Sequence, residues 1–228
     1  MRKIGALLCA LALLLSGCAG AAEPQATVPT TTAPQPTEPK ITVSPESTEA
    51  FMEPFGLYSR TRDGEVEFVM LHFSSAIMTN PEDPYDLASV RATFRQYEVS
   101  PHYIIDREGN IYCYIPEDRA AYQAGYGTWG DDPKYTDLMN DYSIGIELVA
   151  IGSAADMAQY LTAWEYSQID PSLPGYTDAQ YDALDRLLAD LCSRYDIPLD
   201  RDHIIGHEDY SPHKSDPGEL FNWDRILP

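Results

Sequence analysis

The sequence of 228 residues is short of basic side chains. Only 15 Lys and Arg stand against 36 Asp and Glu, which gives a formal net charge of -21 at neutral pH. A surface that neutralises nucleic-acid phosphates needs a basic excess, so this composition argues against a nucleic-acid partner. It also argues against charge-driven adhesion to anionic lipid. A Gly-rich phosphate loop and an internal repeat are both absent from the sequence.

Cysteine is scarce as well, and only Cys113 and Cys192 lie beyond the first 50 residues. Two cysteines cannot form a disulfide framework. Cys113 lies in the apolar run IYCYI, and Cys192 lies within a helical pattern. We therefore expect two buried thiols, with a single bridge as the alternative.

The sequence has no apolar run long enough to span a bilayer at its N-terminus. Residues 4–15 are apolar, follow Arg2 and Lys3, and precede small residues. This order predicts a secretory signal peptide over residues 1–17; a buried N-terminal helix is the alternative. The tetrad LSGC that ends at Cys18 resembles the bacterial lipobox. That resemblance implies an exported cell-envelope lipoprotein, anchored to the membrane through lipid on Cys18 and facing the cell wall.

The next segment is rich in Pro, Thr and Ala, and it has no aromatic residue from position 19 to about 50. Such a composition cannot bury enough surface to fold, so we expect residues 18–53 to form an extended tether. About thirty residues at roughly 3 Å each would reach on the order of 100 Å. Residues 54–228 remain for one folded domain, for which we expect a monomer.

Alternating structural patterns run through this folded part. An apolar run at 65–74 predicts a buried strand, Asp86 can cap a helix, and Thr177 to Gln180 form a capping box that opens a second helix. The helix after Asp86 places Leu87, Val90, Phe94 and Tyr97 on one face. The remaining predictions are a hairpin around residues 106–110, a strand at 143–152, a surface loop near a binding cleft between them, and a short strand at 203–207. The order predicts an α/β domain with a mixed central β-sheet flanked by helices.

All five histidines lie in the folded part, two of them at predicted strand ends. The stretch GHEDYSPHKSDPG, residues 206–218, is either a solvated turn or half of a metal site. A catalytic zinc needs three protein ligands and one open position. His72, His207 and Asp216 could supply them, although spacing alone leaves both interpretations open.

Five segments, in this order along the chain, carry a resemblance that favours the metal site: VMLHFSS, SPHYIIDREGNIY, SIGIELV, TDAQYDALDRLLADLC and IIGHEDYSPHKSDPGELFNWD. Together they resemble the zinc-dependent N-acetylmuramoyl-L-alanine amidase family, over about residues 66–223. The resemblance implies the fold shared by phage T7-type lysozyme amidases and peptidoglycan recognition proteins. It also implies Zn²⁺ held by His72, His207 and Asp216, with peptidoglycan or muropeptide as substrate.

The same resemblance makes Glu147 and Lys214 the catalytic pair. Glu147 can move a proton from water to the leaving amine, and Lys214 can stabilise the oxyanion of the tetrahedral intermediate. A carboxylate in an apolar core strand is costly to bury unless it is paired or has a function, which supports the role of Glu147.

Four further residues are expected to contact substrate or to support the ligands: His102, Gln123, His213 and Trp129. Gln123 stands where the family commonly has His in a His-Ala-Gly run, so an amide could replace a substrate-facing imidazole. His207 and Asp216 are nine residues apart, about one fewer than expected, so His213 in the shortened loop could be a rival ligand. Trp129 could instead pack on the core of the domain itself.

The leading function is hydrolysis of the amide bond between the lactyl group of N-acetylmuramic acid and L-alanine. One alternative is a peptidoglycan-binding sensor on the same fold that does not hydrolyse. Another is a zinc peptidase acting within the stem peptide, because the same metal chemistry hydrolyses any amide.

Overall fold

The computed structural model describes residues 58–227, so the predicted signal peptide, the tether and Cys18 lie outside the described residues. The strands are β1 (Ser59–Thr61), β2 (Phe68–Ser74), β3 (Tyr103–Ile105), β4 (Ile111–Cys113), β5 (Arg119–Ala121), β6 (Ser143–Val149) and β7 (Ile204–Gly206). The α-helices are α1 (Leu87–Tyr97), α2 (Ala163–Ser167), α3 (Asp178–Tyr195) and α4 (His207–Tyr210). The short 3-10 helices are η2 (Pro133–Tyr135), η3 (Met139–Asp141), η4 (Asp156–Gln159) and η5 (Trp223–Arg225).

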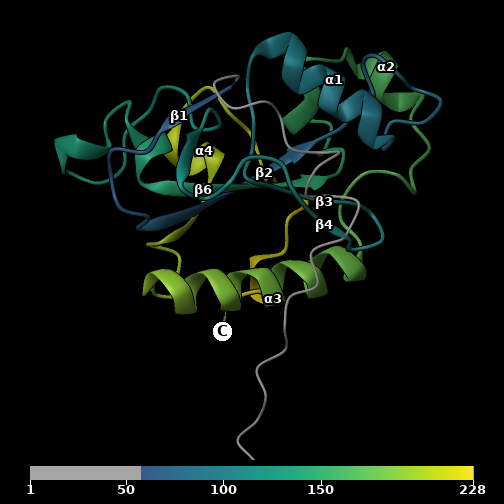
Figure 1. The fold of residues 1–228 in the computed structure, drawn as a ribbon. Coiled ribbons are helices and arrows are strands. Elements are labelled where there is room, and N and C mark those ends of the chain that lie inside the picture. The colour runs from purple at the N-terminus through teal and green to yellow at the C-terminus, as the bar shows by residue number, and fades with distance from the viewer. Residues whose placement is uncertain (1–57, 228) are drawn as a thin grey trace, which may run out of the picture. The chain divides into compact units, whose positions relative to one another are not determined.

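A five-stranded sheet in the order β4-β3-β6-β2-β7 forms the centre of the domain. Strands β3, β6, β2 and β7 are parallel, and β4 pairs with β3 in the antiparallel direction, as the predicted hairpin requires. Helix α3 runs along one face of this sheet and α1 lies on the other side (Figure 1). The prediction of a mixed sheet flanked by helices is confirmed.

Side chains alternate strictly between the two faces of the sheet. On the α3 side, apolar residues of β2, β3 and β6 form one cluster with the leucines of α3: Val69, Leu71, Tyr103, Ile105, Ile144, Ile146, Leu148, Leu184, Leu187, Leu188 and Leu191. The intervening residues of β6 therefore face away from α3, and Glu147 is one of them. His72 on β2 is the register partner of Glu147 and shares that face.

Both longer helices begin where the sequence predicts. The Thr177 hydroxyl accepts a hydrogen bond from the backbone N–H of Gln180, and the Gln180 side-chain oxygen accepts one from the backbone N–H of Thr177. The capping box of α3 is therefore complete. Asp86 accepts the backbone N–H of Ser89 at 2.9 Å and opens α1. The apolar face expected for α1 is shorter than predicted, because Tyr97 is 67% exposed where the helix ends in the left-handed Glu98.

Two short strands escaped prediction. β1 pairs with β5 in a separate antiparallel ribbon, and each has only three residues. The ribbon is held by Arg62, whose guanidinium donates to the backbone carbonyls of Glu117, Arg119 and Asp141. A three-residue pairing across about sixty residues leaves no periodicity for a sequence argument to detect.

The two cysteines of the described residues are free, as expected, but less buried than predicted. Cys113 on β4 and Cys192 on α3 are both free thiols and partly buried. Burial raises the pKa of each thiol to about 11. Within residues 58–227, no helix is long and apolar enough to cross a membrane.

Glu117 ties the loop after β4 to the last turn of α3. Its carboxylate accepts hydrogen bonds from Arg194, Tyr195 and Tyr103 at 2.5–2.7 Å. Burial opposes ionisation of Glu117, but these bonds outweigh it and lower its pKa to about 2. A carboxylate with a lowered pKa stabilises the fold above the pKa of the unfolded chain and loses that contribution as pH falls.

We expect Glu117→Gln to lower the free energy of unfolding by about 2 kcal/mol at pH 7. This is less than the full shift implies, because the Arg194 side chain is 41% exposed. The difference from wild type should shrink as pH falls from about 4.5 towards 2, as measured by urea unfolding at several pH values. Asp190→Asn removes an exposed partner of the same arginine and should change stability by less than about 0.5 kcal/mol. A loss for Glu117→Gln that does not vary with pH would contradict this account.

Candidate active site

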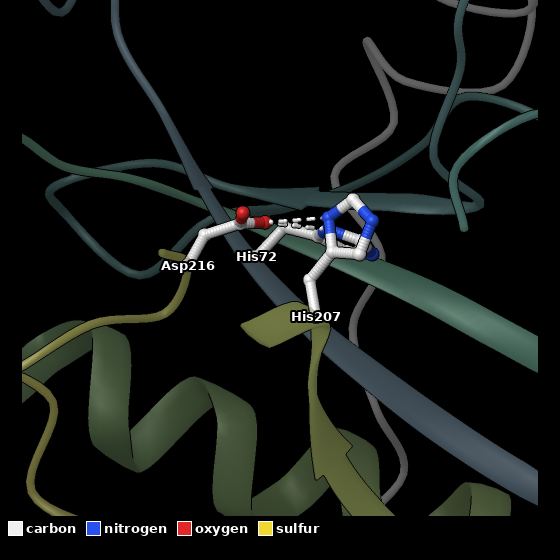
Figure 2. Close-up of side chains that lie close together, drawn as sticks. All are labelled: His72, His207 and Asp216. Carbon is white, nitrogen blue, oxygen red and sulfur yellow. Dashed lines mark hydrogen bonds and ion pairs between the residues drawn. The ribbon is translucent and has the colours of Figure 1, made fainter. Parts of the chain in front are cut away.

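Three side chains from separate segments meet on the sheet face opposite α3. His72 comes from β2, His207 is the first residue of α4 directly after β7, and Asp216 lies in the loop that follows α4. His72 Nδ1 lies 2.8 Å from Asp216 Oδ2 and 3.0 Å from His207 Nδ1. His207 Nδ1 lies 3.0 Å from the same carboxylate oxygen. Figure 2 shows both imidazoles and the carboxylate turned toward one point.

Local packing explains how the loop brings Asp216 back to His207. The Glu208 N–H donates to the Asp216 carbonyl at 2.9 Å, which closes the loop. A Cβ at Gly206 would lie 2.8 Å from Pro217 Cδ, so only glycine allows this approach without a shift. Close packing of Gly206 against Pro217 therefore helps to close the loop that brings Asp216 back beside His207.

The donor set fits a zinc ion. Two imidazole nitrogens and one carboxylate oxygen, all within 4.8 Å of one another, are ligand types that catalytic zinc sites use, with a fourth position left for water or substrate. Ligand atoms placed tetrahedrally at about 2.1 Å from a metal would be roughly 3.4 Å apart, a few tenths of an ångström wider than the distances here. The group His72, His207 and Asp216 is thus consistent with a metal site.

The charges of the cluster favour a cation. Burial opposes ionisation of Asp216, but the two neighbouring imidazoles outweigh it and hold the pKa of this carboxyl well below its usual range. The side chains of His72 and His207 are only 2% and 4% exposed. The cluster therefore presents an ionised carboxylate in a dry setting, where a cation is attracted most strongly.

Glu147 lies directly across the sheet from His72, in register with it on β6. Its Oε2 atom is buried and has no hydrogen-bond partner among the described residues. Burial, and then the charge of Asp216, raise the pKa of Glu147 to about 7, while His72 and Lys214 work in the opposite direction. A carboxyl group in that range can both accept and release a proton near neutral pH.

Lys214 and His213 lie in the loop that leads to Asp216. Both are exposed and line a hollow of about 420 Å³ together with Asp156, Gln159 and neighbours. Lys214 lowers the pKa of Glu147, which places its charge within the field of the site. His213 does not join the group of possible metal ligands, so the structure does not support it as a rival ligand.

His102 is fully enclosed within the domain. It is 0% exposed, its Nδ1 accepts the Gly145 N–H at 2.9 Å, and its Nε2 lies 2.9 Å from the Arg119 carbonyl. Burial and the nearby Arg62 lower the pKa of His102 to about 3, so the ring is neutral. This histidine bonds the backbone of β6, and its burial favours a supporting role over contact with substrate, the two expectations for it.

Gln123 takes the second of its two expected roles, support of a ligand candidate, and Trp129 packs on the domain itself, the alternative expected for it. Gln123 is 8% exposed, and its Oε1 lies 2.6 Å from His72 Nε2. The amide therefore contacts the side of the His72 ring opposite the Nδ1 atom that faces Asp216. Trp129 packs, partly buried, against the core cluster that includes Met70 and Tyr210. Asn140 and Ser143, which bond Gln123, were not singled out from the sequence because no spacing or residue type marks them.

Comparison with known proteins agrees with this geometry. Residues 62–219 match the family described as N-acetylmuramoyl-L-alanine amidase. The 1,6-anhydro-N-acetylmuramyl-L-alanine amidase AmpD of Enterobacter cloacae is 33% identical over 152 residues, which is 66% of this chain and 67% of that protein. The enzyme of the same name from Haemophilus influenzae is 34% identical over 137 residues, 60% of this chain and 61% of that protein.

Solved structures of amidases share the fold of this chain. The Escherichia coli amidase AmiD, in complex with anhydro-N-acetylmuramic acid-L-Ala-D-gamma-Glu-L-Lys, superposes with a TM-score of 0.51 at 26% identity, over 73% of this chain and 59% of that one. AmpDh3 of Pseudomonas aeruginosa, in complex with an anhydromuramic pentapeptide, gives a TM-score of 0.53 at 25% identity, over 77% of this chain and 64% of that one. With the family match spanning most of the described domain, the chain belongs to the N-acetylmuramoyl-L-alanine amidase family.

Proposed function

We propose that this chain is a zinc-dependent amidase of the cell envelope that cuts the bond between the lactyl group of N-acetylmuramic acid and L-alanine. The observation that carries the proposal is the placement of His72, His207 and Asp216 around one point, with the unpartnered oxygen of Glu147 on the same sheet face. His72, His207 and Asp216 would hold the ion. Bound zinc would supply Lewis acidity, which polarises an amide carbonyl and favours ionisation of water.

The chain's own residues account for proton transfer and charge. Glu147, with its raised pKa, takes a proton from the attacking water and passes it to the leaving amine of L-alanine. Lys214, exposed beside the hollow, supplies a positive charge for the oxyanion that forms on the former amide carbonyl. Burial of the ligand imidazoles and of Glu147 Oε2 places proton transfer in a medium of lower dielectric, where electrostatic interactions are stronger than in water.

The substrate that we propose is a muropeptide that carries muramic acid and its stem peptide. Relatives named for 1,6-anhydro-N-acetylmuramyl-L-alanine, and the two complexes with anhydromuramyl peptides, support this class. A sensor without activity is disfavoured because the complete set of ligand and proton-transfer residues is in place. A peptidase within the stem has no comparable support among the relatives described above.

The N-terminal segments fit an enzyme held near the wall. The signal peptide over residues 1–17, lipidation of Cys18 and a tether over residues 18–53 would anchor the catalytic domain of residues 54–228 to the membrane and let it reach peptidoglycan. The lipobox tetrad and the Pro/Thr-rich composition support this arrangement.

The activity is tested by incubating the zinc-loaded chain with purified wall and with anhydromuramyl tripeptide. We expect release of L-alanine amino termini from both, with mass spectrometry locating the cut at the lactyl amide. Chelation, or Asp216→Asn, should abolish release because one of three ligands is lost, and metal analysis should find one zinc per wild-type chain. Cleavage inside the stem peptide would favour the peptidase, and wall binding without cleavage would favour the sensor.

Glu147→Gln should keep zinc binding and lower kcat by about 10²–10⁴-fold, because it removes the proton acceptor and retains the shape of the side chain. Steady-state kinetics with the anhydromuramyl tripeptide measure this loss. Glu117→Gln is the matched control, since it removes a partly buried carboxylate that bonds α3 and should leave kcat unchanged at temperatures where the protein is folded. Equal losses in both variants would assign the effect to stability and not to proton transfer.

Cys18→Ala should release the protein from the membrane fraction of a bacterial expression host, because it removes the residue proposed to carry the lipid. Fractionation and metabolic labelling with a fatty-acid analogue follow this change, with Cys113→Ala as the control that should stay labelled. Labelling of the Cys18→Ala chain would contradict the lipoprotein form.

A further inference from the structure

Two consecutive residues, Gln123 and Ala124, contact the Nε2 atoms of the two candidate ligand histidines. His72 Nε2 lies 2.6 Å from Gln123 Oε1, and His207 Nε2 lies 2.9 Å from the Ala124 carbonyl oxygen. The Nδ1 atoms of both rings point to the shared cluster with Asp216. One dipeptide therefore contacts the far side of each ring.

These contacts determine which nitrogen carries the proton. A carbonyl oxygen only accepts hydrogen bonds, so the Nε2 of each ring must be the donor. Nδ1 is then the ring atom left for the cluster: it can offer its lone pair to a bound metal, and in the metal-free chain it can instead carry a proton that bonds Asp216 Oδ2. For His207 the acceptor is a backbone atom, whereas for His72 it is a side-chain amide whose orientation has to be established.

A relay establishes the orientation of that amide. The Ser143 hydroxyl donates to the Met139 carbonyl at 2.7 Å, which leaves Ser143 Oγ as the acceptor for Gln123 Nε2 at 2.8 Å. Since the amide nitrogen is used there, the oxygen of Gln123 is the atom that faces His72. The hydrogen-bond network thus assigns the side chain without ambiguity between its two ends.

The backbone of the dipeptide is anchored as well. Asn140 Oδ1 accepts the N–H of Gln123 at 3.0 Å and the N–H of Ala124 at 2.8 Å. A Cβ at Gly145 would lie 2.6 Å from Gln123 Cγ, so the glycine of β6 leaves the space that the Gln123 side chain fills. The segment that holds the dipeptide runs directly into β6, the strand that carries Glu147.

We propose that Gln123 and Ala124, anchored by Asn140, form a tautomer clamp that fixes both ligand histidines in the Nε2–H form. Gln123 and Asn140 are positioning residues in this scheme and touch neither substrate nor the reacting atoms. The clamp rests on the proposed zinc site for its purpose, but its hydrogen bonds exist in the metal-free chain. It also explains why an amide serves at position 123, where a substrate contact was expected.

The test compares Gln123→Leu, Gln123→Glu and Asn140→Ala in the full chain. Nitrogen-15 NMR of the imidazoles in metal-free protein reports whether each Nε2 carries a proton, and competition with a chromophoric chelator reports the zinc dissociation constant. Gln123→Leu should lower the fraction of His72 that carries a proton on Nε2, leave His207 in the Nε2–H form and weaken zinc binding by about 10–100-fold. Gln123→Glu keeps an acceptor for His72 and should retain the wild-type tautomer and affinity within a few-fold.

Asn140→Ala should disturb both histidines, because its side chain anchors both residues of the clamp. Gln180→Leu is the matched control: Gln180 is another fully buried amide, bonded to the carbonyls of Ile105 and Val149. It should lower stability and leave the histidine tautomers and the zinc affinity of the folded protein unchanged.

The outcomes separate the clamp from the proposed function. Unchanged His72 tautomer and unchanged zinc affinity in folded Gln123→Leu would overturn the clamp and leave the amidase proposal intact. Absence of zinc binding by wild type, with the tautomer changes still present, would overturn the zinc site and support the clamp. Equal weakening by Gln180→Leu and Gln123→Leu would show a general stability effect and overturn the clamp.

Discussion

The alternation of side chains along β2 and β6 is the constraint on which the site depends. Because α3 covers one face of the sheet with leucines, every second residue of these strands is committed to an apolar core. The intervening positions are the ones that can carry polar groups, and His72 and Glu147 fall on them in register. A shift of one residue in either strand would send a charged or imidazole side chain into the α3 interface. Packing of the core and placement of the chemistry are therefore specified by the same register.

This arrangement also gives the two carboxyl groups of the site, Asp216 and Glu147, opposite pKa shifts. Asp216 stays ionised because two imidazoles lie against it, whereas Glu147, without a hydrogen-bond partner at Oε2, has its pKa raised by burial. Two carboxyl groups in one site thus differ in protonation behaviour through their surroundings alone. The first is suited to bind a cation and the second to exchange protons.

Sequence reasoning was strongest where one short segment carries its own evidence. The capping box at Thr177 and the apolar run of β2 predicted their elements because helix caps and strand burial are local properties. The ligand set came from resemblance across five segments, since no local pattern joins residues 72, 207 and 216. The β1–β5 ribbon was missed, and the choice between substrate contact and ligand support stayed open for Gln123, because both depend on partners far along the chain. Polar side chains acquire a role only from what the fold places beside them.

His102 and His72 show how the neighbours of a side chain determine the role of a single residue type. Both lie on or next to strands of the same sheet, both are buried, and each has Nε2 near a carbonyl oxygen. The difference is at Nδ1, which in His102 accepts a backbone N–H from Gly145 and in His72 points at Asp216. A lone pair already used by a backbone donor cannot bind a metal, whereas one directed at a carboxylate and a second imidazole can. What distinguishes a structural histidine from a ligand here is thus the occupant of a single hydrogen-bonding position, which depends on the register of β3 against β6 and not on the sequence around either residue.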